Sequence, residues 1–153
     1  MSNKKCVDLA ADPLLPNGWS VQHHRGGAKA SKIERNGDNL YLNGRKIKFR
    51  LTIEQREVGV ITGERLLRKL RGKLVLNANV LDYLLRNPCL IPEAWKKDRY
   101  DNPQRLFFWG TIYRDLEETR YVRYLYWRSR WQWNYRPVDG ECEWDISKPA
   151  VCL

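Results

Sequence analysis

The chain has 153 residues and a formal net charge of +10, with 28 lysines and arginines against 18 aspartates and glutamates. This length and a hydrophobic fraction of 42% fit one folded globular domain. No apolar run approaches the roughly 18 residues of a membrane span, and the N-terminus is too polar for a signal peptide. We therefore expect no membrane association and a cytoplasmic location.

The charge is unevenly distributed along the chain. Residues 1–76 hold 16 lysines and arginines against 7 acidic residues, whereas residues 105–153 hold 8 against 7. The aromatic residues are concentrated in the second half, which makes the chain tryptophan-rich there. A basic excess confined to one region indicates a polyanionic partner and says nothing about fold.

Two Asn-Gly pairs mark the first predicted meander. We expect a poorly ordered lead-in at 1–18, a single domain at 19–146 and a C-terminal arm at 147–153. Asn36-Gly37 and Asn43-Gly44 separate alternating segments, and Asn-Gly suits the positive φ of a tight hairpin turn. The pattern predicts an antiparallel meander with strands at about 32–35, 39–42 and 45–51.

Two helices are predicted in the middle of the chain, after a linker at 52–61. Thr62 is a suitable N-cap for a helix at 63–71, and Asn77 for a helix at about 78–86. The second helix must end before Pro88, because proline disfavours helical geometry in the residue before it. A third helical turn is expected after Pro92, which brings Trp95 onto the core.

A second antiparallel meander is predicted at 105–136, where aromatic and β-branched residues dominate. Its strands are expected at about 105–113, 120–127 and 131–136. We expect its tryptophans to form the interior. The fold class is therefore α+β, with two meanders (about 32–51 and 105–136) and two or three short helices between them, in a single domain.

The chain resembles a group of small, uncharacterised bacterial proteins of unknown function. The resemblance rests on Leu76-Asn-Ala-Asn-Val-Leu-Asp-Tyr-Leu-Leu, Ile91-Pro-Glu-Ala-Trp-Lys and Phe107-Phe-Trp-Gly-Thr-Ile-Tyr-Arg-Asp, and covers about 18–136. It implies a bacterial source and a single domain. It implies no activity or site, and this chain has Arg128-Ser-Arg130 where such sequences often have a glycine-rich turn.

The sequence predicts no catalytic residues, metal site or cofactor. The four cysteines form no C-x-x-C pair, and no nucleotide-binding or hydrolase motif is present. His23 and His24 are adjacent, so in a strand they point to opposite faces and at most one serves any one site. Two groups of acids are typical of solvated turns, namely Asp115, Glu117 and Glu118, and Glu141, Glu143 and Asp145.

The basic and aromatic residues together suggest nucleic-acid binding. Phosphate contacts are predicted for Lys46, Lys48, Arg50, Arg65, Arg68, Lys69, Arg71 and Lys73, because such cations release counterions from a polyanion. Base stacking is a weaker hypothesis for Trp131, Trp133 and Tyr135, which share one strand face and otherwise fill a core.

Three functional hypotheses follow. The leading one is a small basic binding module for a polyanionic partner, RNA or the ribosome before duplex DNA. The second is a metal-independent ribonuclease of the toxin type that uses Arg, Lys, Tyr or His23/His24. The third is a protein-interaction module that acts through the aromatic sheet.

Overall fold

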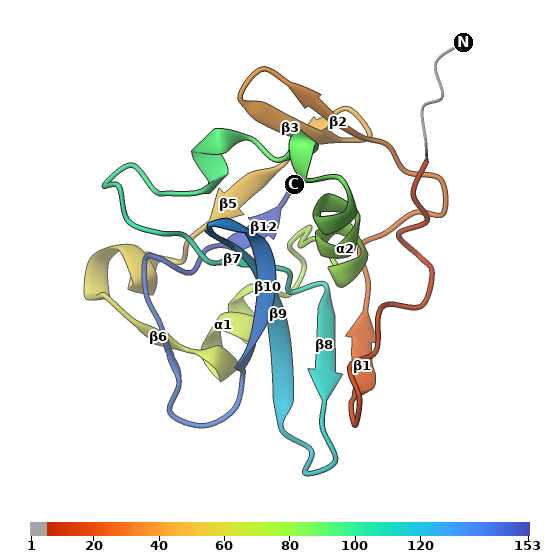
Figure 1. The fold of residues 1–153 in the computed structure, drawn as a ribbon. Helices are drawn as coiled ribbons and strands as arrows, with labels where there is room; N and C mark the ends of the chain where they lie inside the picture. Colours follow the sequence, from red (N-terminus) through yellow and green to blue (C-terminus); the bar gives the residue numbers. More distant parts are fainter. Residues whose placement is uncertain (1–5) are drawn as a thin grey trace.

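The main sheet is organised around β9 (Arg120–Arg128) in the computed structural model, which describes residues 6–153 (Figure 1). β10 (Arg130–Pro137) runs antiparallel to β9 along its whole length. These two strands confirm the predicted hairpin of the second meander. The molecule is a single α+β domain, as predicted.

The strand predicted at 105–113 is instead two strands that share the other edge of β9. β7 (Leu106–Phe107) pairs with the second half of β9, and β8 (Thr111–Arg114) pairs with its start. The break falls at Gly110, where a Cβ would lie 2.8 Å from the backbone of Asn77. The chain leaves the ladder here because glycine permits this close backbone contact.

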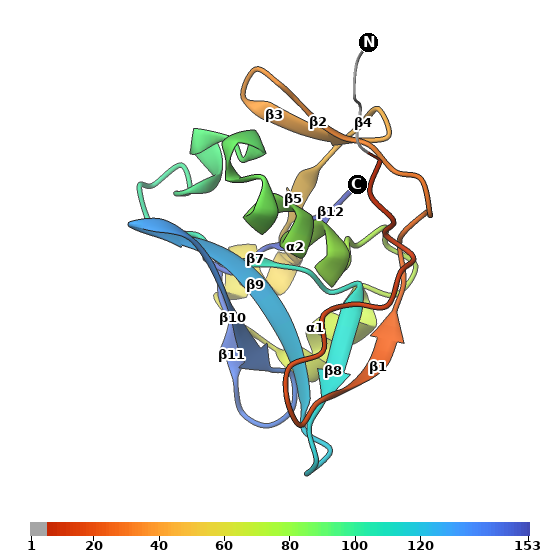
Figure 2. The same ribbon diagram turned by 45° about the vertical axis from the view of Figure 1, so that its right-hand side comes forward.

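Three further strands extend the main sheet (Figure 2). β1 (Ser20–His24) pairs antiparallel with β8. β12 (Ala150–Cys152) runs parallel to β7, and β5 (Lys48–Arg50) runs antiparallel to β12. The order is β1-β8-β9-β7-β12-β5, with β10 on the remaining edge of β9. The segment predicted as an arm, 147–153, therefore supplies an interior strand.

A separate three-stranded sheet contains β2 (Ile33–Asn36), β3 (Asn39–Leu42) and β4 (Arg45–Lys46). Both predicted hairpins form, and Asn43-Gly44 has the predicted positive φ at both residues, 50° and 81°. The first turn is shifted by one residue, because Asn36 pairs with Asn39 and the turn consists of Gly37, with a φ of 63°, and Asp38. Both hairpins could be predicted because turn geometry depends on local residue type.

The strand predicted at 45–51 is two strands separated by Ile47. The Ile47 amide donates to the Leu40 carbonyl oxygen of β3 at 2.9 Å, and its side chain is only 5% exposed. From Lys48 onward the chain pairs with β12 in the main sheet. The expected alternation of cations and apolar side chains holds, but Lys46 lies in a different sheet from Lys48 and Arg50.

Both predicted helices form, and their predicted caps are confirmed. α1 (Gly63–Lys69) begins after Thr62, whose hydroxyl accepts from the Arg65 amide at 3.4 Å. α2 (Ala78–Arg86) begins after Asn77, whose Oδ1 accepts from an amide of the first turn at 3.0 Å. Each cap satisfies an N–H group that has no partner within the helix.

The shorter elements complete the chain. The turn expected after Pro92 is η3 (Glu93–Trp95), and η2 (Pro88–Leu90) precedes it. The predicted linker contains an unexpected π-helical turn, η1 (Glu54–Val58). β6 (Ile61–Thr62) pairs with β11 (Glu143–Trp144).

Two hydrophobic clusters lie on opposite faces of the main sheet. Leu125 of β9 packs in the cluster that contains α2, whereas Val122 packs in the cluster that contains α1. Residues an odd number apart in a strand point to opposite faces. Trp109 and Trp144, which are 1% and 0% exposed, belong to the α1 cluster. Of the four tryptophans in the second meander, the prediction of an interior position therefore holds fully only for Trp109, because Trp127, Trp131 and Trp133 are half-buried.

Residues 8–11 lie beside the start of α2. Of the predicted lead-in, residues 1–5 fall outside the described residues. Val7 and Leu9 are buried, and the Asn77 side-chain amide donates to the Leu9 carbonyl oxygen at 2.9 Å. This segment is therefore anchored to the helix that covers one face of the sheet.

Candidate nucleic-acid interface

The cations of β5 project on the side of the sheet that α1 covers. Arg50 lies opposite Ala150 of β12, and Lys48 lies opposite Cys152. Directly opposed residues share a face, and Ala150 packs in the same cluster as Leu66 of α1. The pairing register thus brings Lys48 and Arg50 to the side on which α1 lies.

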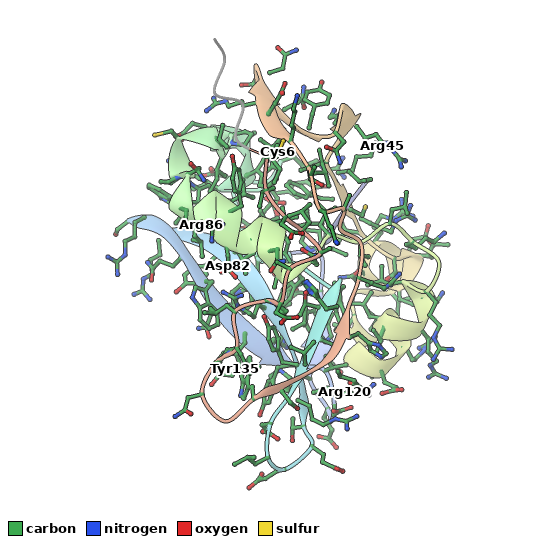
Figure 3. All side chains as sticks on the ribbon, turned by 90° about the vertical axis from the view of Figure 1, so that its right-hand side faces the viewer. Cys6, Arg45, Asp82, Arg86, Arg120 and Tyr135 are labelled. Carbon is green, nitrogen blue, oxygen red and sulfur yellow. The ribbon has the colours of Figure 1, made fainter. Side chains whose placement is uncertain are left out.

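The exposed side of α1 adds a dense group of cations. Arg65, Arg68 and Lys69 line a shallow depression of about 400 Å³, and Figure 3 shows nitrogen-tipped side chains projecting around this helix. Arg71 and Lys73 follow in the exposed turn after the helix. We call these residues and the two β5 cations the basic face, which consists of Lys48, Arg50, Arg65, Arg68, Lys69, Arg71 and Lys73.

One carboxylate partly neutralises the basic face. Glu54 of η1 accepts from the Lys69 ammonium at 2.6 Å and lies 4.0 Å from the Arg65 guanidinium. The hydrogen bond from Lys69 lowers the pKa of the Glu54 carboxyl, so the carboxyl stays ionised. Within residues 6–153, the remaining five members have no ion pair, namely Lys48, Arg50, Arg68, Arg71 and Lys73.

Lys46, the eighth predicted phosphate contact, lies apart from the basic face. It belongs to β4 and pairs with Tyr41 of β3. Its side chain is exposed. Because the chain changes sheets at Ile47, Lys46 is separated from the other seven predicted phosphate contacts.

The predicted stacking residues lie on the α2 side of the sheet. Trp131 and Trp133 are half-buried and pack against the α2 cluster. The Trp133 ring lies 4.0 Å from the guanidinium carbon of Arg123. Tyr135 is 46% exposed, and its ring packs edge-on against that of Trp19 at 4.9 Å. These aromatic residues and the basic face are thus on opposite faces.

The histidines are not arranged as a catalytic pair. His24 Nδ1 lies 2.8 Å from the Thr111 hydroxyl, and Nε2 lies 2.9 Å from the Ala11 carbonyl oxygen. Both ring nitrogens are thus engaged by internal groups that connect β1, β8 and the N-terminal segment. His23 is exposed.

The acidic residues stabilise turns. Asp115 accepts from the Glu117 and Thr119 amides, each at 2.9 Å, and from the Tyr121 hydroxyl at 3.0 Å. Burial, and then the hydrogen bond to Asp115, raise the pKa of the Tyr121 hydroxyl. Asp145 accepts from Lys148 at 3.0 Å. Among the described residues no three His, Cys, Asp or Glu side chains form a possible metal site.

Sequence reasoning missed a second basic region around a cavity of about 500 Å³. Arg56, Lys97, Arg99 and Tyr100 line this cavity together with apolar side chains. The lining comes from separate parts of the chain, so no single motif contains all of it. The run Lys96-Lys97-Asp98-Arg99-Tyr100 was the available signal, because it combines cations with an aromatic residue.

Comparison with known proteins adds no further constraint. No family model, no curated protein and no solved structure matches this chain. The resemblance to small bacterial proteins over 18–136 stays a prediction, and so do the bacterial source and the cytoplasmic location. Within residues 6–153, none of the helices has both the length and the apolar composition required to cross a bilayer.

Proposed function

We propose that this protein is a small module that binds RNA, free or in the ribosome, through its basic face. The supporting observation is that five exposed cations, which form no ion pair within residues 6–153, project from α1, from the turn after it and from β5 on the side of the sheet that α1 covers. Binding of this kind is driven by counterion release and needs no base-specific contact.

Binding has better support than cleavage. A metal-independent ribonuclease needs a positioned general base within reach of the substrate. His24 makes internal contacts at both ring nitrogens. A protein partner would bind the aromatic face of β10. Of Trp131, Trp133 and Tyr135 on that face, only Tyr135 is exposed, at 46%, and the two tryptophans are half-buried.

Fluorescence anisotropy with a labelled single-stranded RNA tests the proposal. Five phosphate contacts predict that log Kobs falls against log salt with a slope of about −3.5 between about 50 and 200 mM salt. A double variant, Arg68→Glu with Arg71→Glu, reverses two charges of the basic face and is expected to abolish binding at the higher salt concentration.

A second double variant controls for net charge. Arg86→Glu with Arg128→Glu makes the same charge change at the end of α2 and at the tip of the β9–β10 hairpin. We expect this control to retain most of the affinity. Equal losses in the two variants, or no binding by the unmodified protein at about 50 mM salt, would reject the basic face as an RNA site.

A further inference from the structure

The cavity of about 500 Å³ has the dimensions of a small-molecule site. It lies between β5, η1, the loop at 96–104 and the segment at 146–149. Figure 1 shows these segments together at the left of the molecule, and they come from three separate parts of the chain, 48–58, 96–104 and 146–149. The cavity is therefore a product of the tertiary fold.

Aromatic and aliphatic side chains form its apolar walls. Phe49 is held edge-on against Trp95, with ring centroids 4.9 Å apart. Tyr100 is 59% exposed, and the Arg99 guanidinium lies over its ring at 4.8 Å and donates to its hydroxyl at 2.8 Å. Leu51 and Ile146 add aliphatic surface. A ring held in place beside an exposed ring suits a planar ligand.

A nearly buried amide supplies a hydrogen-bonding group. Gln104 is 9% exposed, and its Nε2 donates to the carbonyl oxygens of Trp95 at 3.3 Å and Lys97 at 3.2 Å. Its Oε1 accepts no hydrogen bond from residues 6–153. This oxygen is thus available to an N–H donor of a ligand, such as the amino group of a nucleobase.

The charge around the cavity favours an anion. Arg56, Lys97 and Arg99 line it against one lining acid, Asp98, and Lys97 is paired with Asp101 at 3.2 Å, so the excess positive charge comes from Arg56 and Arg99. Asp98 Oδ1 accepts from the Tyr100 and Asn102 amides at 2.8 and 3.0 Å, which fixes this carboxylate in the loop. A ligand with a planar ring and an anionic group therefore complements the site.

η1 connects the cavity to the basic face. Arg56, which lines the cavity, and Glu54, which binds Lys69 of α1, lie two residues apart in this turn. We propose that the cavity binds one nucleotide of the RNA strand held by the basic face. The base stacks on Tyr100 and Phe49, and the phosphate contacts Arg56 and Arg99. The inference rests on the proposed function for its connection to a strand.

Two measurements with Tyr100 variants test this assignment. Tyr100→Ala removes the exposed ring, and Tyr100→Phe keeps the ring but loses the hydroxyl. Loss of a stacked base is expected to weaken RNA binding about tenfold for Tyr100→Ala with an unchanged salt slope, whereas Tyr100→Phe stays close to the unmodified protein. Tyr135→Ala is the matched control, since it removes an exposed ring that packs against Trp19 and does not line the cavity, and it is expected to leave affinity unchanged.

Titration with free nucleoside monophosphates, followed by NMR, separates the two proposals. Shifts near Tyr100 and Gln104 that disappear in Tyr100→Ala support the cavity even if the protein binds no RNA, in which case the proposed function alone fails. RNA binding that is the same in Tyr100→Ala and the unmodified protein overturns the cavity and leaves the basic face standing. Absence of both RNA and monophosphate binding rejects both.

Discussion

Arg123 of β9 is completely buried and makes two hydrogen bonds to Asp82 of α2, at 3.0 and 2.8 Å. This ion pair joins the central strand to the helix that covers one of its faces. The Trp133 ring lies over the same guanidinium. The contact therefore fixes α2 against the β9–β10 hairpin.

Removing the carboxylate is expected to be costly. Asp82→Ala leaves a buried guanidinium unpaired, which lowers the free energy of unfolding by about 3–5 kcal/mol. Urea unfolding followed by tryptophan fluorescence measures this loss. Asp12→Ala, an exposed aspartate beside the same helix, is the control and should cost little.

The double replacement Asp82→Leu with Arg123→Met tests whether stability requires the charges of this pair or only side chains that fill the same space. Apolar residues of similar volume often replace a buried ion pair without loss, so we expect the double variant to recover most of the stability. A cost below about 1 kcal/mol for Asp82→Ala would contradict the view of this pair as an essential buried contact.

Gly110→Ala tests the close contact that splits the first strand of the second meander. The new Cβ would lie 2.8 Å from the Asn77 backbone, so we expect a loss of about 3 kcal/mol from overpacking. Gly140→Ala is the control, because Gly140 has a φ of 86° but nothing within 4 Å of a Cβ. It should cost about 1 kcal/mol from backbone strain alone. Similar melting temperatures for the two variants would refute the contact.

The contact between Arg120 and Asp139 makes the free energy of unfolding depend on pH in the acid range. Hydrogen bonds from its guanidinium lower the pKa of the Asp139 carboxyl below the ordinary 3.8. A lowered pKa in the folded state means that this stabilisation is fully present above pH 3.8 and is lost as pH falls through the lower, folded value. Arg120→Met should therefore cost about 1 kcal/mol near neutral pH and progressively less in acid.

Urea titrations of both proteins across the acid range measure that difference. Because Arg120 also pairs with Glu64, Glu64→Gln serves as a control that leaves the Asp139 contact in place. A cost of Arg120→Met that is constant down to strongly acid pH would show that the contact with Asp139 does not contribute.

The separation of β4 from β5 predicts different roles for neighbouring lysines. Lys48→Ala removes one cation of the basic face. The slope of log Kobs against log salt should therefore become shallower by the contribution of about one phosphate contact. Lys46→Ala should leave the slope unchanged, because Lys46 projects from the other sheet. The same anisotropy series measures both, and identical slopes for the two variants would contradict this division.

Local signals were sufficient for the elements whose geometry depends on neighbouring residues. The caps at Thr62 and Asn77 and the turns at Gly37 and Gly44 follow from side-chain and backbone preferences within a few positions. The α+β class follows from the same signals, since they place helices between two β-rich regions.

Elements that depend on distant partners could not be predicted. Ile47 continues an unbroken alternating pattern, and only the position of β12 shows that the chain changes sheets there. Likewise, the cavity beside Tyr100 combines segments that no spacing rule connects. The sequence predicted the chemistry of the basic residues, and the pairing register determined which of them lie together.

The pairing of β5 with β12 also bears on how the chain reaches this structure. Arg50 lies opposite Ala150, which is 100 positions later (150 minus 50), and β1 lies opposite β8 across a similarly long stretch. Domains dominated by such remote pairings fold in about milliseconds to seconds, because a long loop must close before its contacts form. Until that closure, β5 has no partner in the main sheet, so Lys48 and Arg50 are not yet brought to the side on which α1 lies.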